Sequence, residues 1–127
     1  MKILLDTNAL IWWLKDDPKL GSRARALLAD GRHELLTSIV SLWELTIKWR
    51  IGKLEHRGSV FADLLAEQNI GLLLINPRHF AVLESLPAHH KDPFDHLILA
   101  QAKLENARLM TSDPHMSNYG VECISTS

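Results

Sequence analysis

The chain has 127 residues, of which 46% are hydrophobic and 23% charged, and its net charge is −1 at neutral pH. This length and composition predict one globular domain over residues 1–127 and exclude a disordered chain. The charge excludes a strongly basic nucleic-acid-binding protein. Any nucleic acid must therefore be held by a local basic patch, by metal ions, or by both.

The cysteine content and the N-terminal residues predict the compartment. Cys123 is the single cysteine, so the chain forms no internal disulfide, as expected for a protein in a reducing compartment. The apolar run at residues 3–5 is far too short for a signal peptide or a membrane span. We therefore expect a cytoplasmic protein.

The first half of the chain predicts strands that alternate with helices. In chain order these are a strand at residues 2–6, helices at 8–15 and 22–30, a strand at 34–37, and a helix from Ser38 or Ser41 to about Arg50. The first strand, KILLD, is apolar up to its last residue, as expected for a strand that is buried on both faces. Gly31 and Gly52 are placed to end the second and third helices.

The second half continues the alternation. It predicts a helix at residues 59–69, a strand at 71–75, a helix from Pro77, a helix from Pro93 to about Asn106, and strands at 108–111 and 121–124. Of the strands, GLLLI at 71–75 has the clearest pattern of a buried one. Strands that alternate with helices predict an α/β fold, in which a parallel central sheet has helices on both faces.

Four carboxylates are predicted to meet at one edge of this sheet. Asp6 ends the first strand (LLDTN) and Asp113 the fourth (LMTSD), while Glu44 and Asp95 lie near the starts of helices on the same side. Ligands of open parallel sheets bind at the carboxyl ends of the strands. The sequence therefore predicts a site at this edge.

Most of these acids also have a purely structural interpretation when taken singly. Asp92 and Asp113 each precede a proline, which is typical of a helix N-cap. Ser41 and Glu44 match a capping box, and Glu44 is also spaced to pair with Lys48 one helical turn later. Asp95 would lie in the first turn of its helix, where a carboxylate favours the helix dipole.

The combination of acids favours a metal site. Asp6 interrupts an apolar core segment, and four carboxylates at one edge would repel one another unless a cation lay between them. Ligands that are all oxygen suit Mg²⁺ or Mn²⁺, which are typical of sites that hydrolyse phosphodiester bonds.

The motifs around these acids resemble those of the PIN-domain nucleases, and in particular the VapC-like toxins of bacterial toxin–antitoxin pairs. The resemblance rests on LLDTNALIWWL, SLWEL, KDPFDHLILAQA and LMTSD, and it covers essentially the whole chain. It implies four catalytic acids, Asp6, Glu44, Asp95 and Asp113, with Asp6, Asp95 and Asp113 as metal ligands. Whether Asp92 also takes part in the site stays open.

The same resemblance implies an activity and partners. Members of this family typically cleave RNA with Mg²⁺ or Mn²⁺ and are held inactive by a cognate antitoxin, and we also expect a homodimer. Residues 9–14 (ALIWWL) are all apolar, although only one face of a helix can pack on the sheet. If Leu10 and Leu14 face the core, Trp12 projects outward, and we expect it to contact the antitoxin.

Two other residue groups were considered as sites. The histidines His89, His90, His96 and His115 lack the cysteine partners and spacing of typical zinc sites, and we interpret them as surface or substrate-facing residues. Basic residues gather after the third helix and form a possible phosphate contact: Lys48, Arg50, Lys53, His56 and Arg57. No stretch of interleaved aromatic residues suggests base stacking.

Three alternative functions were weighed. The haloacid dehalogenase-like phosphatases end a strand with Asp-x-Asp, but Asn8 stands at the second position and the chain is short for such an enzyme. A receiver domain needs a phosphoacceptor after its third strand, where Asn76 and Pro77 stand instead. The remaining alternative is a catalytically silent PIN fold that binds RNA or protein, and the intact set of four acids argues against it.

Overall fold

The structure is a computed structural model of the chain that describes residues 1–88 and 92–127. Its centre is a five-stranded sheet with the strand order β3-β2-β1-β4-β5, in which each neighbouring pair is parallel. The strands are β1 (Lys2–Leu5), β2 (Glu34–Ser38), β3 (Ile70–Leu73), β4 (Arg108–Thr111) and β5 (Cys123–Ser125). The expectation of an α/β fold with a parallel sheet is confirmed.

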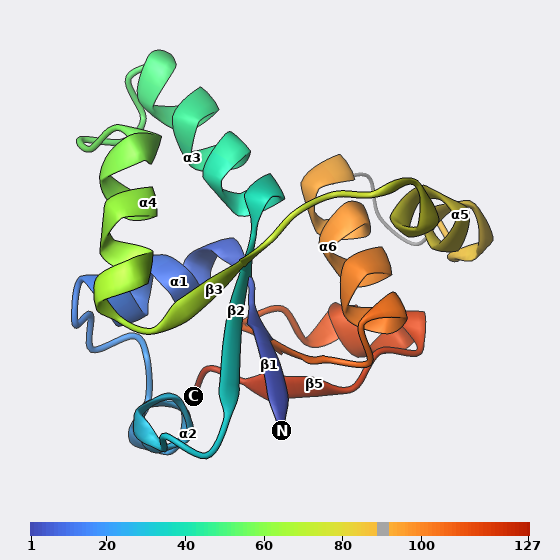
Figure 1. Ribbon diagram of the computed structural model, residues 1–127, viewed down its shortest axis with the longest axis horizontal. Coiled ribbons are helices and arrows are strands. Elements are labelled where there is room, and N and C mark those ends of the chain that lie inside the picture. The colour runs from blue at the N-terminus through green and yellow to red at the C-terminus, as the bar shows by residue number, and fades with distance from the viewer. Residues whose placement is uncertain (89–91) are drawn as a thin grey trace.

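Helices cover both faces of the sheet (Figure 1). They are α1 (Thr7–Leu14), α2 (Ser22–Ala29), α3 (Ile39–Arg50), α4 (Gly58–Glu67), α5 (Pro77–Ser85), α6 (Pro93–Leu104) and a 3₁₀ helix, η1 (Pro114–Tyr119). Residues of β1 alternate between the two layers: Ile3 packs with Leu10 and Phe61, whereas Leu4 packs with Ile98. This confirms that β1 is buried on both faces. Within the described residues, no helix is long and apolar enough to cross a membrane.

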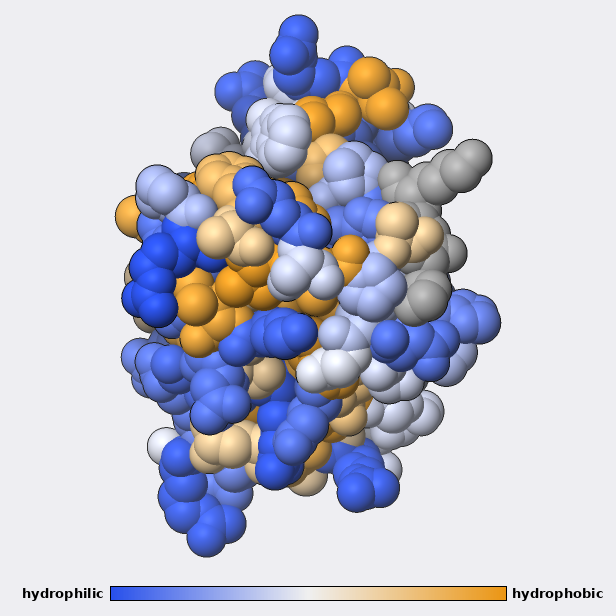
Figure 2. All heavy atoms as spheres, turned by 90° about the vertical axis from the view of Figure 1, so that its right-hand side faces the viewer, coloured by the Kyte–Doolittle hydropathy of each residue, from blue (hydrophilic) through white to orange (hydrophobic). Residues whose placement is uncertain are grey.

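The predicted character of β3 is wrong. Its apolar run indicated the clearest buried strand, but β3 lies at the edge of the sheet, where Leu72 is 43% exposed and Leu74, just beyond it, is 62% exposed. Apolar side chains also appear among hydrophilic ones on the side of the molecule where α5 lies (Figure 2). An apolar run cannot distinguish a central from an edge strand, because the order of strands is decided by long-range pairing.

Of the two glycines predicted to end helices, one is confirmed and the other is wrong. Gly52 follows α3 with a φ of 79°, a left-handed conformation that glycine adopts without steric cost, as expected for a helix stop. Gly31 does not end α2 in a left-handed conformation, because the helix already stops at Asp30, whose backbone is extended. That prediction is wrong.

The topology places a crevice beside β1. In the sheet, β2 and β3 lie on one side of β1, whereas β4 and β5 lie on the other. The segments that follow β1 and β4 therefore leave the same edge of the sheet from neighbouring strands. The backbone N of Asp6 donates to the carbonyl of Met110 over 3.0 Å, which ties the end of β1 to β4. In open α/β sheets such a point of reversal is where ligands bind.

Candidate active site

Asp6 lies at this point of reversal, directly after β1. It follows β1 and caps α1, where its Oδ1 accepts from the backbone N of Ala9 over 2.8 Å, and the residue is only 7% exposed. Burial raises the pKa of Asp6 above its ordinary value, and the charge of Glu44 raises it further. Hydrogen bonds from the Ala9 backbone and the Thr111 side chain oppose the shift without cancelling it.

Glu44 is held from two sides. Its Oε1 accepts from the Thr7 hydroxyl over 2.7 Å, and its Oε2 lies 3.1 Å from the Nζ of Lys48. The predicted pairing with Lys48 is therefore confirmed, and the carboxylate is oriented by contacts from both α1 and α3.

The capping-box interpretation of Glu44 is wrong. Ser38 caps α3, its Oγ accepting from the backbone N of Val40 over 3.0 Å, so Glu44 lies beyond the first turn. Ser41 instead places its Oγ 3.0 Å from the hydroxyl oxygen of Thr7. Glu44 thus contributes nothing to the helix start, and its contacts are with the site.

Asp95 is the residue at which the acids meet. Burial raises the pKa of Asp95 to about 7, and the charges of Asp92, Asp6 and Glu44 raise it as well. A carboxyl group responds to other carboxylates in this way only when they are near. Asp6 at the end of β1, Glu44 on α3 and Asp95 on α6 therefore lie near enough for their charges to interact, and Asp92 also acts on Asp95.

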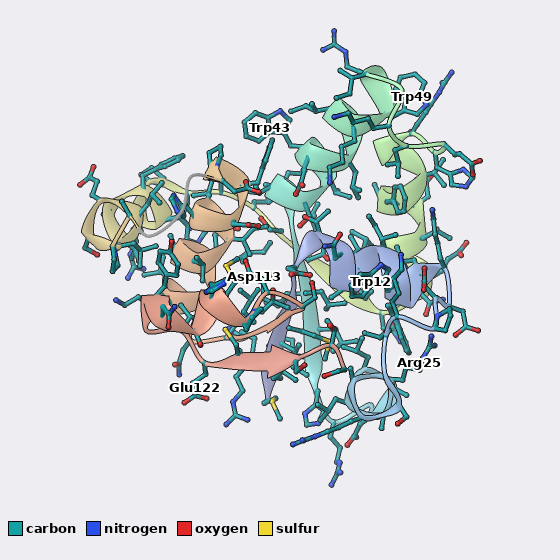
Figure 3. All side chains as sticks on the ribbon, turned by 180° about the vertical axis from the view of Figure 1, so that it is seen from behind. Trp12, Arg25, Trp43, Trp49, Asp113 and Glu122 are labelled. Atoms are coloured by element: carbon teal, nitrogen blue, oxygen red, sulfur yellow. The ribbon has the colours of Figure 1, made fainter. Side chains whose placement is uncertain are left out.

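Asp113 lies at the same end of the sheet and is joined to Asp6 through Thr111. It caps η1, its Oδ1 accepting from the backbone N of His115 over 2.9 Å. Its own backbone N donates to Thr111 Oγ1 over 3.1 Å, and Thr111 also hydrogen-bonds Asp6. Asp6 and Asp113 together raise the pKa of the Cys123 thiol, after burial, which has the larger effect. Figure 3 shows Asp113 beside α6 and η1.

The donor set suits a hard divalent cation. The side chains gathered here offer carboxylate and hydroxyl oxygens, and the negative charges of Asp6 and Glu44 act unfavourably on Asp95. Among residues 1–88 and 92–127, no three His, Cys, Asp or Glu side chains already stand close enough together to hold a metal ion. By chemistry the residues fit a hard divalent cation such as Mg²⁺ or Mn²⁺.

Asp92 and Asp95 have different local roles, which a pair of substitutions should separate. Asp92 caps α6, its Oδ1 accepting from the backbone N of Phe94 (2.9 Å) and of Asp95 (3.3 Å). Asp92→Ala should lower stability by about 1 kcal/mol or more in urea unfolding at pH 4.5, where the loss of the cap is joined by the loss of the hydrogen bond between Asp92 and protonated Asp95. Asp92→Asn keeps a cap and should stay close to wild type. An equal loss in both variants would show that the charge of Asp92, rather than its capping, stabilises the helix.

The histidines do not assemble a site in the described part of the chain. His96 contacts Tyr119, with 3.4 Å between Nε2 and the phenol oxygen, and His115 is exposed. His89 and His90 lie outside the described residues. His79, which was not singled out from the sequence, is fully buried and structural: its Nδ1 accepts from the backbone N of Asn76, and its Nε2 pairs with Glu105 at 3.2 Å.

The expectation that Trp12 projects outward is wrong. Trp12 is half-buried and packs against the core (Figure 3). The chain turns back after α1, where the backbone N of Asp17 donates to the Trp12 carbonyl over 2.8 Å. This turn places the Nζ of Lys19 5.9 Å from the centre of the indole ring. The exposed tryptophans are Trp43 and Trp49, both on α3.

An aromatic pair at the same end of the sheet was missed by the sequence analysis. The rings of Trp43 and Phe94 meet edge to face, with 5.0 Å between their centres. Each of them directly precedes a site acid, Glu44 and Asp95 respectively. That shared spacing is the one signal in the sequence that could have revealed the pair.

Comparison with known proteins adds a family and a fold. The family model described as PIN domain matches residues 3–122, and no curated protein matches the chain. Similar solved structures include VapBC2 from Rickettsia felis bound to a DNA fragment from its promoter, with 18% identity, a TM-score of 0.77 and 98% of each chain covered.

Two further structures have the same fold. VapBC-1 from nontypeable Haemophilus influenzae has 21% identity and a TM-score of 0.70, over 99% of this chain and 98% of that one. A toxin–antitoxin complex from Klebsiella pneumoniae has 17% identity and a TM-score of 0.64, over 98% of each chain. At these identities the likeness shows the fold alone.

Proposed function

The chain belongs to the PIN-domain family, and from this premise we propose that it is a divalent-metal-dependent endoribonuclease and the toxin of a toxin–antitoxin pair. The observation that carries the proposal is that Asp6 at the end of β1, Glu44 on α3 and Asp95 on α6 lie near enough for their charges to act on Asp95, at the point where the strand order reverses. Such a group costs stability, since nearby negative charges raise the pKa of Asp6 and of Asp95. A role in binding a cation explains why the fold holds it.

We assign the metal, Mg²⁺ or Mn²⁺, to Asp6, Asp95 and Asp113. When bound, a divalent cation supplies a positive charge that stabilises phosphoryl oxygens and lowers the pKa of water, which favours hydrolysis near neutral pH. Asp6 is fixed for this task because its second function, capping α1, restrains the carboxylate. Asp95 stands on the first turn of α6, near enough to Asp6 for the two charges to interact.

Glu44 has a separate part in the proposed mechanism. The contacts from Thr7 and Lys48 hold its carboxylate in one orientation, from which it can orient the attacking water and accept its proton. Lys48 adds a positive charge next to the acids, and a phosphate of the RNA backbone can share it. The other basic residues after α3 stay a hypothesis for further phosphate contacts.

The partner proposal comes from the similar structures, one of which is a toxin–antitoxin complex. We propose that an antitoxin protein binds beside the acids and that α1 contributes to the contact, with Trp12 supporting that surface from a half-buried position. A homodimer is proposed on the family resemblance.

The proposal is tested by cleavage of a labelled single-stranded RNA. We expect endonucleolytic products with Mg²⁺ or Mn²⁺, none with EDTA, and restored cleavage when excess metal is returned. The same assay with a single-stranded DNA of the same sequence measures whether the enzyme requires ribose in its substrate. RNA that is bound but left intact with either metal would contradict the proposal and would favour a catalytically silent binding module.

Binding of metal alone should stabilise the folded protein, because the unfolded chain has no assembled site. At a concentration 100 times its dissociation constant, Mn²⁺ should add about 2.7 kcal/mol, which thermal unfolding resolves easily. The matched control is Asp63→Asn, which removes an exposed carboxylate of α4 and should respond like wild type. Asp6→Asn should respond weakly, and an equal rise in Tm in all three proteins would place the metal elsewhere.

A further inference from the structure

The aromatic pair of α3 and α6 lies where the acids lie. Trp43 extends from α3 toward the first turn of α6 (Figure 3), and its ring meets that of Phe94 at an interplanar angle of 69°. Trp43 directly precedes Glu44 on α3 and Phe94 directly precedes Asp95 on α6, so the ring contact lies at the same level of the two helices as these acids. A group bound at the acids therefore has an aromatic surface next to it.

Trp43 is also unusually open for so large a side chain, with 56% of its surface exposed. An edge-to-face pair occupies at most one face of the Trp43 ring, which leaves the exposed indole free to stack, whereas Phe94 is partly buried and packs against the core. Trp49, on the same helix, is a useful contrast: it is 37% exposed, but the Arg57 guanidinium lies 5.0 Å from its ring centre. It also stands six residues further along α3, about 9 Å away along the helix axis.

We propose that Trp43, held by Phe94, is the stacking platform for one unpaired base of the RNA, next to the phosphodiester that is cleaved. The inference rests on the proposed ribonuclease function and deepens it by naming a class of substrate, single-stranded RNA. Every base has a π-face, so such a platform accepts bases with little regard to sequence but requires that the base be unstacked and unpaired.

A nucleobase is the occupant that the surroundings favour. The platform lies at the contact between α3 and α6, the helices that carry Glu44 and Asp95, and Lys48 of α3 places its Nζ 3.1 Å from Glu44. The base and the phosphate of a nucleotide are a short distance apart. A nucleotide whose phosphate is bound at the acids can therefore place its base on Trp43. The ring contact with Phe94 restrains the indole of Trp43, so less side-chain conformational entropy is lost when a base binds.

The test compares Trp43→Leu, Trp43→Phe and Trp49→Leu, each assayed for cleavage of a single-stranded RNA with Mg²⁺ or Mn²⁺. Trp43→Leu keeps an apolar side chain without a π-face and should raise KM roughly tenfold, as expected for the loss of one stacking aromatic. Trp43→Phe should recover most of that loss. Trp49→Leu should match wild type, and a duplex of the same sequence should be a poor substrate for all four proteins.

A second measurement locates the base. A set of oligonucleotides, each lacking one base, should show for the wild type one position beside the cleavage site where the loss of the base weakens binding. Trp43→Leu should be insensitive at that position, since removing either partner of one contact costs about as much as removing both. Binding is measured by anisotropy in an Asp6→Asn background, so that the RNA stays intact.

The outcomes separate this inference from the proposed function. If no protein cleaves RNA, the proposed function fails and the inference with it. If wild type cleaves and Trp43→Leu behaves like Trp49→Leu in both measurements, only the stacking platform is overturned. A change in sedimentation of Trp43→Leu without any change in RNA binding would also overturn it, by assigning the exposed tryptophan to contact with a second copy of the chain.

Discussion

Asp6→Asn should lower metal-dependent RNA cleavage by at least about 100-fold, because loss of a direct ligand exceeds the 10- to 100-fold cost of losing a residue that only supports one. The same change should leave the fold intact. Asparagine still caps α1 through its side-chain oxygen, which replaces the carboxylate oxygen that accepts from Ala9. Removing a buried charge that Glu44 repels should hold or raise the Tm of the metal-free protein.

Initial cleavage rates in Mg²⁺, together with thermal unfolding in EDTA, check both halves of this expectation. Asp63→Asn is the matched control, since it removes the same charge from an exposed position on α4 and should keep wild-type activity. Wild-type cleavage by Asp6→Asn would remove Asp6 from the site. A large drop in Tm would instead show that the acid acts mainly as a structural residue.

The metal-free protein should become less stable as the pH rises from about 4 to about 7, and Asp95→Asn should remove most of this dependence. Burial and the charges of Asp92, Asp6 and Glu44 raise the pKa of Asp95 from its ordinary 3.8 to about 7 in the folded state. The folded protein therefore holds this proton more tightly than the unfolded chain does. The stability gained in this way is complete below pH 4 and is lost as the pH rises through 7.

The expected size is on the order of 2 kcal/mol, after the shift is discounted for the solvent that reaches this carboxyl group. Urea unfolding of wild type and Asp95→Asn in EDTA at intervals from pH 4.5 to 8 measures it as the difference between the two proteins. Titrating groups remote from the acids contribute equally to both proteins and cancel, so the difference reports on Asp95 together with the acids that interact with it. Parallel pH profiles would mean that the charges of the other acids do not reach Asp95, which would weaken the assignment of one shared site.

Much of the fold was predictable from local patterns. The five strands and six α-helices were anticipated within a few residues, because the apolar periodicity, the prolines at helix starts and the caps are each encoded by neighbouring residues. Asp92 and Asp113 have the capping roles that their following prolines indicated. The short 3₁₀ helix η1 was not predicted, since six residues carry too little periodicity to distinguish such a helix from a loop.

The site was only partly predictable. The sequence predicted that Asp6 and Asp113 lie at the ends of strands. For Glu44 it was compatible both with a capping box and with a place in the site. The contact that decides between them joins Glu44 to Thr7 on another helix, 37 residues away. The same applies to Trp12, whose exposure depends on the turn at Asp17, and to Trp43, whose partner Phe94 comes from another helix.

By itself, then, the sequence determined the elements, the alternation that makes the sheet parallel, and the acids available at its carboxyl edge, because all of these follow from residue types at short spacings. The tertiary structure alone decided that β3 is an edge strand, that Glu44 and Asp95 meet near Asp6, and that α3 is tied to α6 by the hydrogen bond between Ser38 and Gln101, 63 residues apart. These properties arise from contacts between distant segments, and such contacts form only when strand order and helix packing are settled together.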